Sequence, residues 1–145
     1  LRGSFTGMRS YHTKAHFNRA VLEGVAYSLK ECYNVIQSLG MQMNSASIIG
    51  GGGKSPLWSQ IVADMLGIEL KKMACDDSSF GSAMLGGIVA GAFDGFEDCI
   101  ARCTKPVSII HPNEENYKIY EKGFATYKAI HDALEPVYHA MASEE

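Results

Sequence analysis

The sequence IIGGGGKSPLWSQIVADMLGIEL, residues 48–70, contains the pattern that decides the fold. Its first part ends a short apolar run, residues 44–49, which is typical of a buried strand. Four glycines follow at residues 50–53. Ser55 and Pro56 then favour the start of a helix, because serine caps free N–H groups and proline has none to leave unpaired. The predicted order is strand, glycine loop, helix.

The glycine loop matches neither of the two familiar phosphate-binding motifs. In GxxxxGK[ST] the first glycine would fall on Ile48, and in GxGxxG nothing after Gly53 supplies the third glycine. Four consecutive glycines nevertheless leave backbone N–H groups unobstructed beside a helix N-terminus, whose dipole favours an anion. The residues alone therefore predict anion binding by an α/β domain, with a flexible tight turn as the alternative.

Helical periodicity predicts one long helix before the glycine loop and another at the end of the chain. The first covers residues 14–39, and the second covers residues 113–142 with a kink or an end at Pro136. The first has an apolar stripe made of Leu22, Val25, Leu29, Cys32, Ile36 and Leu39. The second has an aromatic stripe, interpreted as core packing, made of Tyr117, Tyr120, Phe124, Tyr127, Leu134 and Val137.

Shorter elements are predicted between the loop helix and the last helix. Residues 68–73 resemble a second strand, residues 80–93 a helix of small and apolar side chains, and residues 96–103 a short helix. An extended connection lies between Pro106 and Pro112. The glycines inside residues 80–93 weaken a helix, but they let it approach another backbone or a ligand closely.

The composition is that of one globular domain: the 145 residues are 46% hydrophobic and 20% charged. A net charge of −3 argues against nucleic acid or an acidic membrane as the main partner. No apolar run approaches the roughly 18 to 20 residues that span a bilayer. Residues 1–17 lack the apolar core of a signal peptide. The first residue is not methionine, so we expect the chain to begin partway through a longer protein.

Cysteine and histidine usage indicates a reduced, cytoplasmic protein without a metal site. The four cysteines form no CxxC pair and no dense disulfide pattern. Cys99 and Cys103 stand four residues apart, as do His12 and His16, so each pair could share a helix face. Two ligands without a second pair nearby seldom hold a metal, and ordinary packing is the better interpretation.

Four stretches in unbroken order resemble the FGGY family of carbohydrate kinases. Residues 2–7, RGSFTG, are similar to the family's RGxFxGL segment, and residues 16–26 resemble its H-x-x-R-A-x-L-E-G-x-A helix. Residues 50–67 are similar to GGGxxSxxWxQxxADxxG, and residues 81–91 to GAAxLAxxxxG. The serine after the glycines favours the xylulokinase-like members, because glycerol kinases tend to have asparagine there. Together the four stretches cover nearly the whole chain.

This resemblance implies an α/β fold, namely the C-terminal lobe of an actin-like (ribonuclease H-like) ATPase with several packed helices. Residues 1–145 would be the nucleotide-binding domain, without the N-terminal sugar lobe and without the start of this lobe. ATP or ADP would bind the backbone N–H groups around Gly51, and Ser55 would lie near the adenine or ribose. The implied nucleotide-binding residues are Gly50, Gly51, Gly52, Gly53 and Ser55.

In such kinases the ATP γ-phosphoryl group passes to a hydroxyl of a sugar such as xylulose, with Mg²⁺ bridging the phosphates and an aspartate as base. The resemblance places that base and the sugar site in the missing lobe, so we expect no catalytic residue in this chain. Asp64, Asp76 and Asp77 are tempting substitutes, but Asp64 matches a motif position after the loop and is expected to hold its helix. Arg19 and Glu23 are expected to pair with each other or to brace the loop.

Two other functions stay open from the sequence. One is an ATP-binding regulatory lobe of the actin superfamily without kinase activity. The other is an interaction domain whose glycines only make a turn. Neither the sugar nor the oligomeric state is determined, and a homodimer is one option, since a missing lobe would leave apolar surface exposed.

Overall fold

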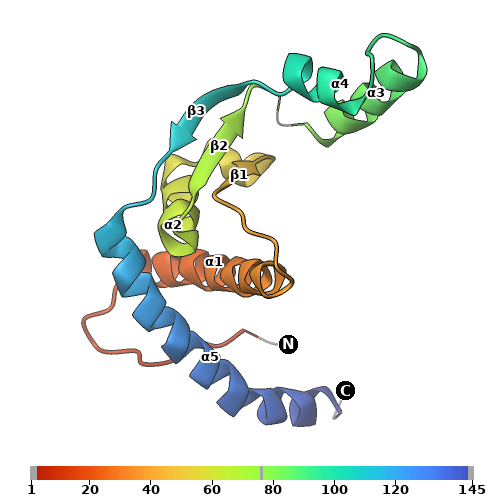
Figure 1. The fold of residues 1–145 in the computed structure, drawn as a ribbon. Coiled ribbons are helices and arrows are strands. Elements are labelled where there is room, and N and C mark those ends of the chain that lie inside the picture. The colour runs from red at the N-terminus through yellow and green to blue at the C-terminus, as the bar shows by residue number, and fades with distance from the viewer. Residues whose placement is uncertain (1–2, 76, 144–145) are drawn as a thin grey trace.

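A three-stranded sheet lies at the middle of the molecule, with helices on either side of it along the chain (Figure 1). The computed structural model describes residues 3–75 and 77–143. β1 (Ser45–Ile48) pairs in parallel with β2 (Glu69–Met73), and β3 (Pro106–Ile110) pairs antiparallel with β2. Parallel neighbours need a crossover connection, which α2 supplies between β1 and β2. The two predicted strands are confirmed, and the predicted extended connection contains a third strand.

The helix α2 (Pro56–Leu66) begins and ends as the sequence predicts. The Ser55 Oγ accepts a hydrogen bond from the Trp58 N–H at 3.3 Å, which caps the first turn. Gly67 ends the helix in the left-handed conformation, with φ of 69°. The helix contacts the sheet and two further helices, α1 and α5. Its inner residues form the centre of the core, namely Ile61, Val62, Ala63 and Met65.

The helix α1 (Lys14–Ser38) confirms the predicted span within one residue, but it buries a different face from its apolar stripe. The buried residues are Ala26, Lys30 and Tyr33. Four side chains of the stripe are exposed, including Leu39 at 72%, while Leu22 and Ile36 are half-buried and Leu22 packs against the core. The small Ala26 lets α2 approach closely, and this face, rather than the most apolar one, packs against α2 and α5.

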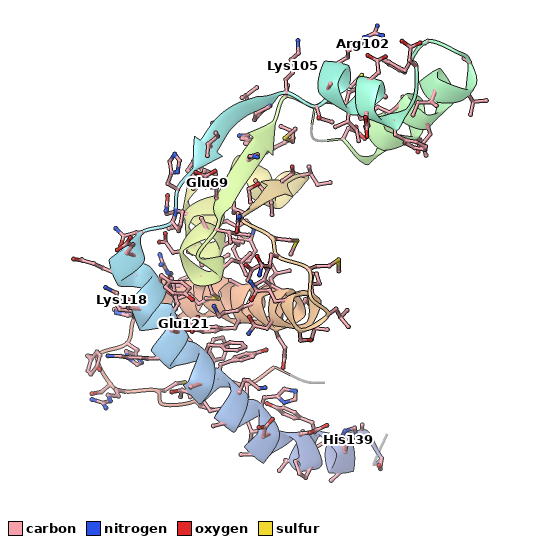
Figure 2. All side chains as sticks on the ribbon, viewed as in Figure 1. Glu69, Arg102, Lys105, Lys118, Glu121 and His139 are labelled. Atoms are coloured by element: carbon pink, nitrogen blue, oxygen red, sulfur yellow. The ribbon has the colours of Figure 1, made fainter. Side chains whose placement is uncertain are left out.

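Lys30 joins three helices from a buried position. Its Nζ donates a hydrogen bond to the Met65 O at 2.9 Å, at the carboxyl end of α2. The same ammonium pairs with Glu121 of α5, which Figure 2 labels where α5 crosses α1. It also lies 5.0 Å from the centre of the Tyr117 ring. A buried ammonium is costly without partners, and here a carbonyl, a carboxylate and an aromatic face all compensate it.

The helix α5 (Glu114–Ala142) packs its first half against α1. Asn113 caps it, because its Oδ1 accepts from the N–H groups of the next turn. The Tyr27 ring stacks on the Tyr127 ring, with centroids 5.2 Å apart, and a side chain at Gly123 would run into the Tyr27 hydroxyl. Of the two outcomes predicted at Pro136, a kink or an end, the end is wrong. The helix continues through this exposed residue, where water can replace the hydrogen bond that proline cannot make.

The helices α3 (Ser78–Val89) and α4 (Phe96–Cys103) form an arm beyond the ends of β2 and β3, away from α1 and α5 (Figure 1). α4 has the predicted bounds. α3 ends four residues before the predicted position 93, and Gly91 follows with φ of 76°. At Gly87 a Cβ would meet the Phe93 ring at 2.5 Å, so this glycine makes room for a side chain rather than for the predicted backbone or ligand. Within the part of the chain that the structure describes, no helix has the length and apolar character to cross a membrane.

We expect Tyr27→Phe to reduce the loss of stability at alkaline pH. Burial raises the pKa of Tyr27 to about 12, and the nearby Glu23 and Tyr120 add to this effect. A raised pKa stabilises the fold fully below about pH 10, and the benefit is lost as the pH rises from about 10 through 12. The free energy of unfolding, measured with urea at several pH values above 9, should therefore fall less steeply in the variant.

Tyr11→Phe, at an exposed ring, should keep the wild-type slope. Equal slopes in all three proteins would contradict the prediction.

Candidate functional site

The glycine loop leaves β1 at its carboxyl end, which is where open α/β sheets bind ligands. Gly50 turns the chain with φ of 78°, and a single 3₁₀ turn, η1 (Gly51–Lys54), follows. The Gly53 N–H donates to the Gly50 O at 3.1 Å, and the Ser55 N–H donates to the Gly52 O at 3.1 Å. The loop thus has one defined path from the sheet into α2.

The four glycines of the loop differ in whether the structure would allow a larger residue at their position. Gly50 needs its positive φ, which other residues rarely adopt. A Cβ at Gly52 would lie 2.9 Å from the Trp58 Nε1, whereas a Cβ at the buried Gly53 would make only an ordinary contact with Ile48 at 3.5 Å. At Gly51 the φ is not positive, and a Cβ would meet no described atom within 4 Å beyond its chain neighbours. The space beside Gly51 is therefore open to a ligand.

The exposed side of the loop presents unpaired donors. Among the described residues, the N–H groups of Gly51 and Gly52 donate to no acceptor. They lie just before the N-terminus of α2, and Lys54 adds an exposed positive charge. Free N–H groups beside a helix N-terminus form a site for a phosphate or a carboxylate. The arrangement suits an anion.

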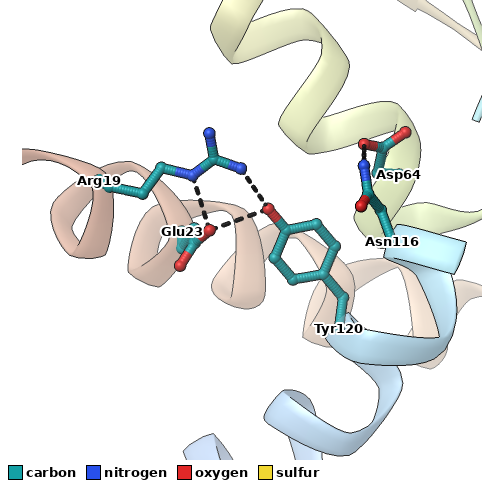
Figure 3. Close-up of polar contacts among 5 residues, drawn as sticks. All are labelled: Arg19, Glu23, Asp64, Asn116 and Tyr120. Carbon is teal, nitrogen blue, oxygen red and sulfur yellow. Dashed lines mark hydrogen bonds and ion pairs between the residues drawn. The ribbon is translucent and has the colours of Figure 1, made fainter. Parts of the chain in front are cut away.

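Asp64 is a structural residue, as the sequence predicts. It is buried, and its Oδ1 accepts from the Gln60 Nε2 at 2.7 Å and from the Asn113 N–H at 2.8 Å. Its Oδ2 accepts from the Asn116 Nδ2 at 2.8 Å (Figure 3). The carboxylate joins α2 to the first turn of α5 and has its oxygens directed at these partners. It is not placed to act as a base.

The other two aspartates named from the sequence do not form a second carboxylate site in the described residues. Asp76 lies outside the residues that the structure describes. Asp77 caps α3, where its Oδ1 accepts from the Ser79 N–H at 2.9 Å and from the Ser79 Oγ at 2.8 Å. The backbone hydrogen bond from Ser79 lowers the pKa of Asp77, and Lys54 adds to the effect.

Arg19 and Glu23 pair with each other, as expected, but they brace α5 rather than the loop. The Arg19 Nε donates to the Glu23 Oε1 at 2.7 Å, and its Nη2 donates to the Tyr120 hydroxyl at 2.7 Å. That hydroxyl donates in turn to the Glu23 Oε1 at 2.9 Å (Figure 3). The sequence showed Tyr120 only as part of an aromatic stripe, and its polar role was missed.

The paired histidines serve the start of α1. The rings of His12 and His16 stack 5.3 Å apart. The His12 Nδ1 accepts from the Arg9 N–H at 3.2 Å, and the His16 Nδ1 accepts from the Thr13 N–H at 3.1 Å. Across the described residues, no group of three or more histidine, cysteine or acidic side chains could hold a metal ion.

Two cavities lie away from the glycine loop. The larger, about 950 Å³ and wide open, is lined at the amino ends of β1 and β2 by residues that include Asn44, Glu69 and His111. There the His111 Nδ1 lies 3.0 Å from the Glu69 Oε1. The smaller, about 250 Å³, lies beneath the N-terminal segment beside Phe5. Neither cavity is lined by a residue of the glycine loop.

Comparisons with known proteins show which family this chain resembles. Residues 1–90 match the model described as the C-terminal domain of the FGGY family of carbohydrate kinases. The chain is 39% identical over 132 residues to xylulose kinase of Staphylococcus epidermidis, covering 90% of this chain and 27% of that protein. It is 30% identical over 144 residues to xylulose kinase of Bacillus subtilis, covering 99% and 29%.

A solved structure shares the fold. The crystal structure of xylulose kinase from Rhodospirillum rubrum superposes with a TM-score of 0.81 at 28% identity, covering 96% of this chain and 28% of that one. The chain thus spans less than three tenths of the length of these curated relatives and of this structure.

Replacing Asp64 should destabilise the fold. Asp64→Asn removes the charge and turns an amide donor towards donors, so we expect the free energy of unfolding to fall by about 1–3 kcal/mol. Urea unfolding followed by circular dichroism measures this difference. Asp94→Asn, at an exposed carboxylate, serves as the control and should change stability little. Equal stability of the two variants would contradict the structural role of Asp64.

Proposed function

The chain belongs to the FGGY family of carbohydrate kinases, and from this premise we propose that it is the ATP-binding part of a sugar kinase. The reaction would transfer the γ-phosphoryl group of ATP to a hydroxyl of a sugar such as xylulose. The resemblance seen in the sequence is confirmed, as is the expected fold class, the C-terminal lobe of an actin-like ATPase. The relatives are kinases, so a non-kinase regulatory lobe and a plain interaction domain have less support.

The observation that carries the proposal is the exposed backbone of the glycine loop. The free N–H groups of Gly51 and Gly52 would donate to phosphate oxygens of ATP or ADP, and the N-terminus of α2 would favour their charge. Gly50 and Gly53 hold the path of the loop on the strand side. Ser55 is exposed at the first turn of α2, and we place the adenine or ribose beside it.

In this mechanism the chain binds and orients the nucleotide, which is the main protein contribution to phosphoryl transfer. The exposed Lys54 would lower the repulsion among the phosphates. Mg²⁺, when bound, would supply positive charge that offsets the negative charge of the phosphates. The described residues offer no cluster of ligands for the ion, and Asp64 is already hydrogen-bonded, so no step is assigned to metal ligands of this chain.

The sugar and the catalytic base are proposed to lie in a part of the enzyme beyond these residues. The relatives have more than seven tenths of their length outside the matched region, which leaves room for a second lobe. Closure of that lobe over the open side of the loop would exclude water from the transfer. The four free cysteines fit a reducing cytoplasm, where we place the enzyme.

Gly51→Ala should weaken nucleotide binding without harming the fold. Its Cβ would enter the open space where we place the phosphates, and it would meet no described atom within 4 Å beyond its chain neighbours. We expect the affinity for ADP, measured by calorimetry, to fall at least about tenfold. The free energy of unfolding should stay the same or rise by about 0.4–1 kcal/mol.

Gly24→Ala is the matched control, because that glycine also has open space around its Cβ but lies in α1, away from the loop. It should bind ADP like the wild type. If Gly51→Ala also bound ADP like the wild type, the phosphates would not lie at this loop.

The 145-residue chain alone should bind nucleotide weakly and show no sugar kinase activity, because the base is not among its residues. A coupled assay of ADP release with ATP, Mg²⁺ and xylulose measures this. Sugar-dependent ADP formation by the purified chain would contradict the placement of the base.

A further inference from the structure

Trp58, the single tryptophan of the chain, lies against the glycine loop. It stands in the first turn of α2, where its N–H donates to the capping Ser55 Oγ. Its indole covers Gly52 so closely that an added Cβ would lie 2.9 Å from the Nε1 and 3.1 Å from the Cδ1. Real Cβ atoms do not approach another atom this closely without a shift, so the indole and the Gly52 backbone are in direct contact.

The contact restrains a segment that is otherwise free to move. Consecutive glycines have more backbone freedom than any other residues. The strand side of the loop is held by Gly53, which is buried beside Ile48. The indole holds the loop at Gly52, so the donor groups of Gly51 and Gly52 lie directly before or at a held position. Fixing them before a ligand arrives lowers the entropy that binding must remove.

We propose that Trp58 is the positioning residue of the nucleotide loop, acting through packing of its ring on Gly52. This inference rests on the proposed function, since the loop must bind a nucleotide for its position to matter. The indole is half-buried at the edge of the core, whose fully buried centre is formed by other residues of α2 such as Ile61 and Met65. The loop should therefore depend on Trp58 more than the fold does.

The test compares Trp58→Phe, which keeps an aromatic ring, with Trp58→Ala, which removes it. Leu57→Ala is the matched control, because Leu57 is the exposed neighbour in the same helical turn. We expect Trp58→Ala to weaken ADP binding about tenfold by calorimetry, while Trp58→Phe and Leu57→Ala stay within about threefold of the wild type. Amide hydrogen exchange should quicken in Trp58→Ala at Gly53 and Ser55, whose N–H groups bond within the loop, and not in the rest of α2.

Two further readouts keep the outcomes separate. The emission of Trp58 in the wild-type chain should change on titration with ADP to millimolar concentration, since no other tryptophan contributes. If Trp58→Ala does not fold, Trp58→Leu takes its place and should show the same loss of affinity.

Each outcome decides a different claim. A wild-type chain that binds no ADP would overturn the proposed function, and this inference with it. A wild type that binds ADP, with equal affinity and equal loop exchange in Trp58→Ala, would overturn only the role of Trp58.

Discussion

The position of α2 sets the position of the glycine loop, because the loop leads directly into its first turn. α2 is held mainly at its second half. There Asp64 accepts hydrogen bonds from its own helix and from the start of α5, and Lys30 of α1 binds the Met65 carbonyl. Both charged groups are buried and compensated, so moving either one would leave an unpaired charge in the core. The core therefore fixes one end of α2 and lets the other present the loop.

The charges along α2 match its dipole at both ends. Lys30 places a positive charge at the carboxyl end, where the helix carries partial negative charge. At the amino end the free N–H groups of Gly51 and Gly52 lie in front of the partial positive charge, with no acidic partner bonded to them in the described residues. The helix thus has a compensated end in the core and an uncompensated end at the surface. A phosphate group would compensate the partial positive charge at the amino end, as Lys30 compensates the partial negative charge at the carboxyl end.

Local signals in the sequence predicted the elements well, because each depends on neighbours along the chain. Ser55, Pro56 and Gly67 mark the ends of α2 within one residue, and α4 has its predicted bounds. The packing depended on distant partners and was not predictable. From the sequence alone, Lys30 is expected to be solvated, but in the fold it lies beside Met65 and Glu121, and most of the apolar stripe is exposed instead. Likewise the loop glycines look equivalent in the sequence, and only the fold separates Gly51 from Gly52, through the ring of Trp58.

The most direct test of the account is the shift of backbone amide resonances when ADP is added to the isotope-labelled chain. If the phosphates bind at the glycine loop, the largest changes fall on Gly51 and Gly52, with smaller ones at Ser55 and the first turn of α2. Changes centred instead on the cavity beside Glu69 and His111, with the loop amides unmoved, would contradict it.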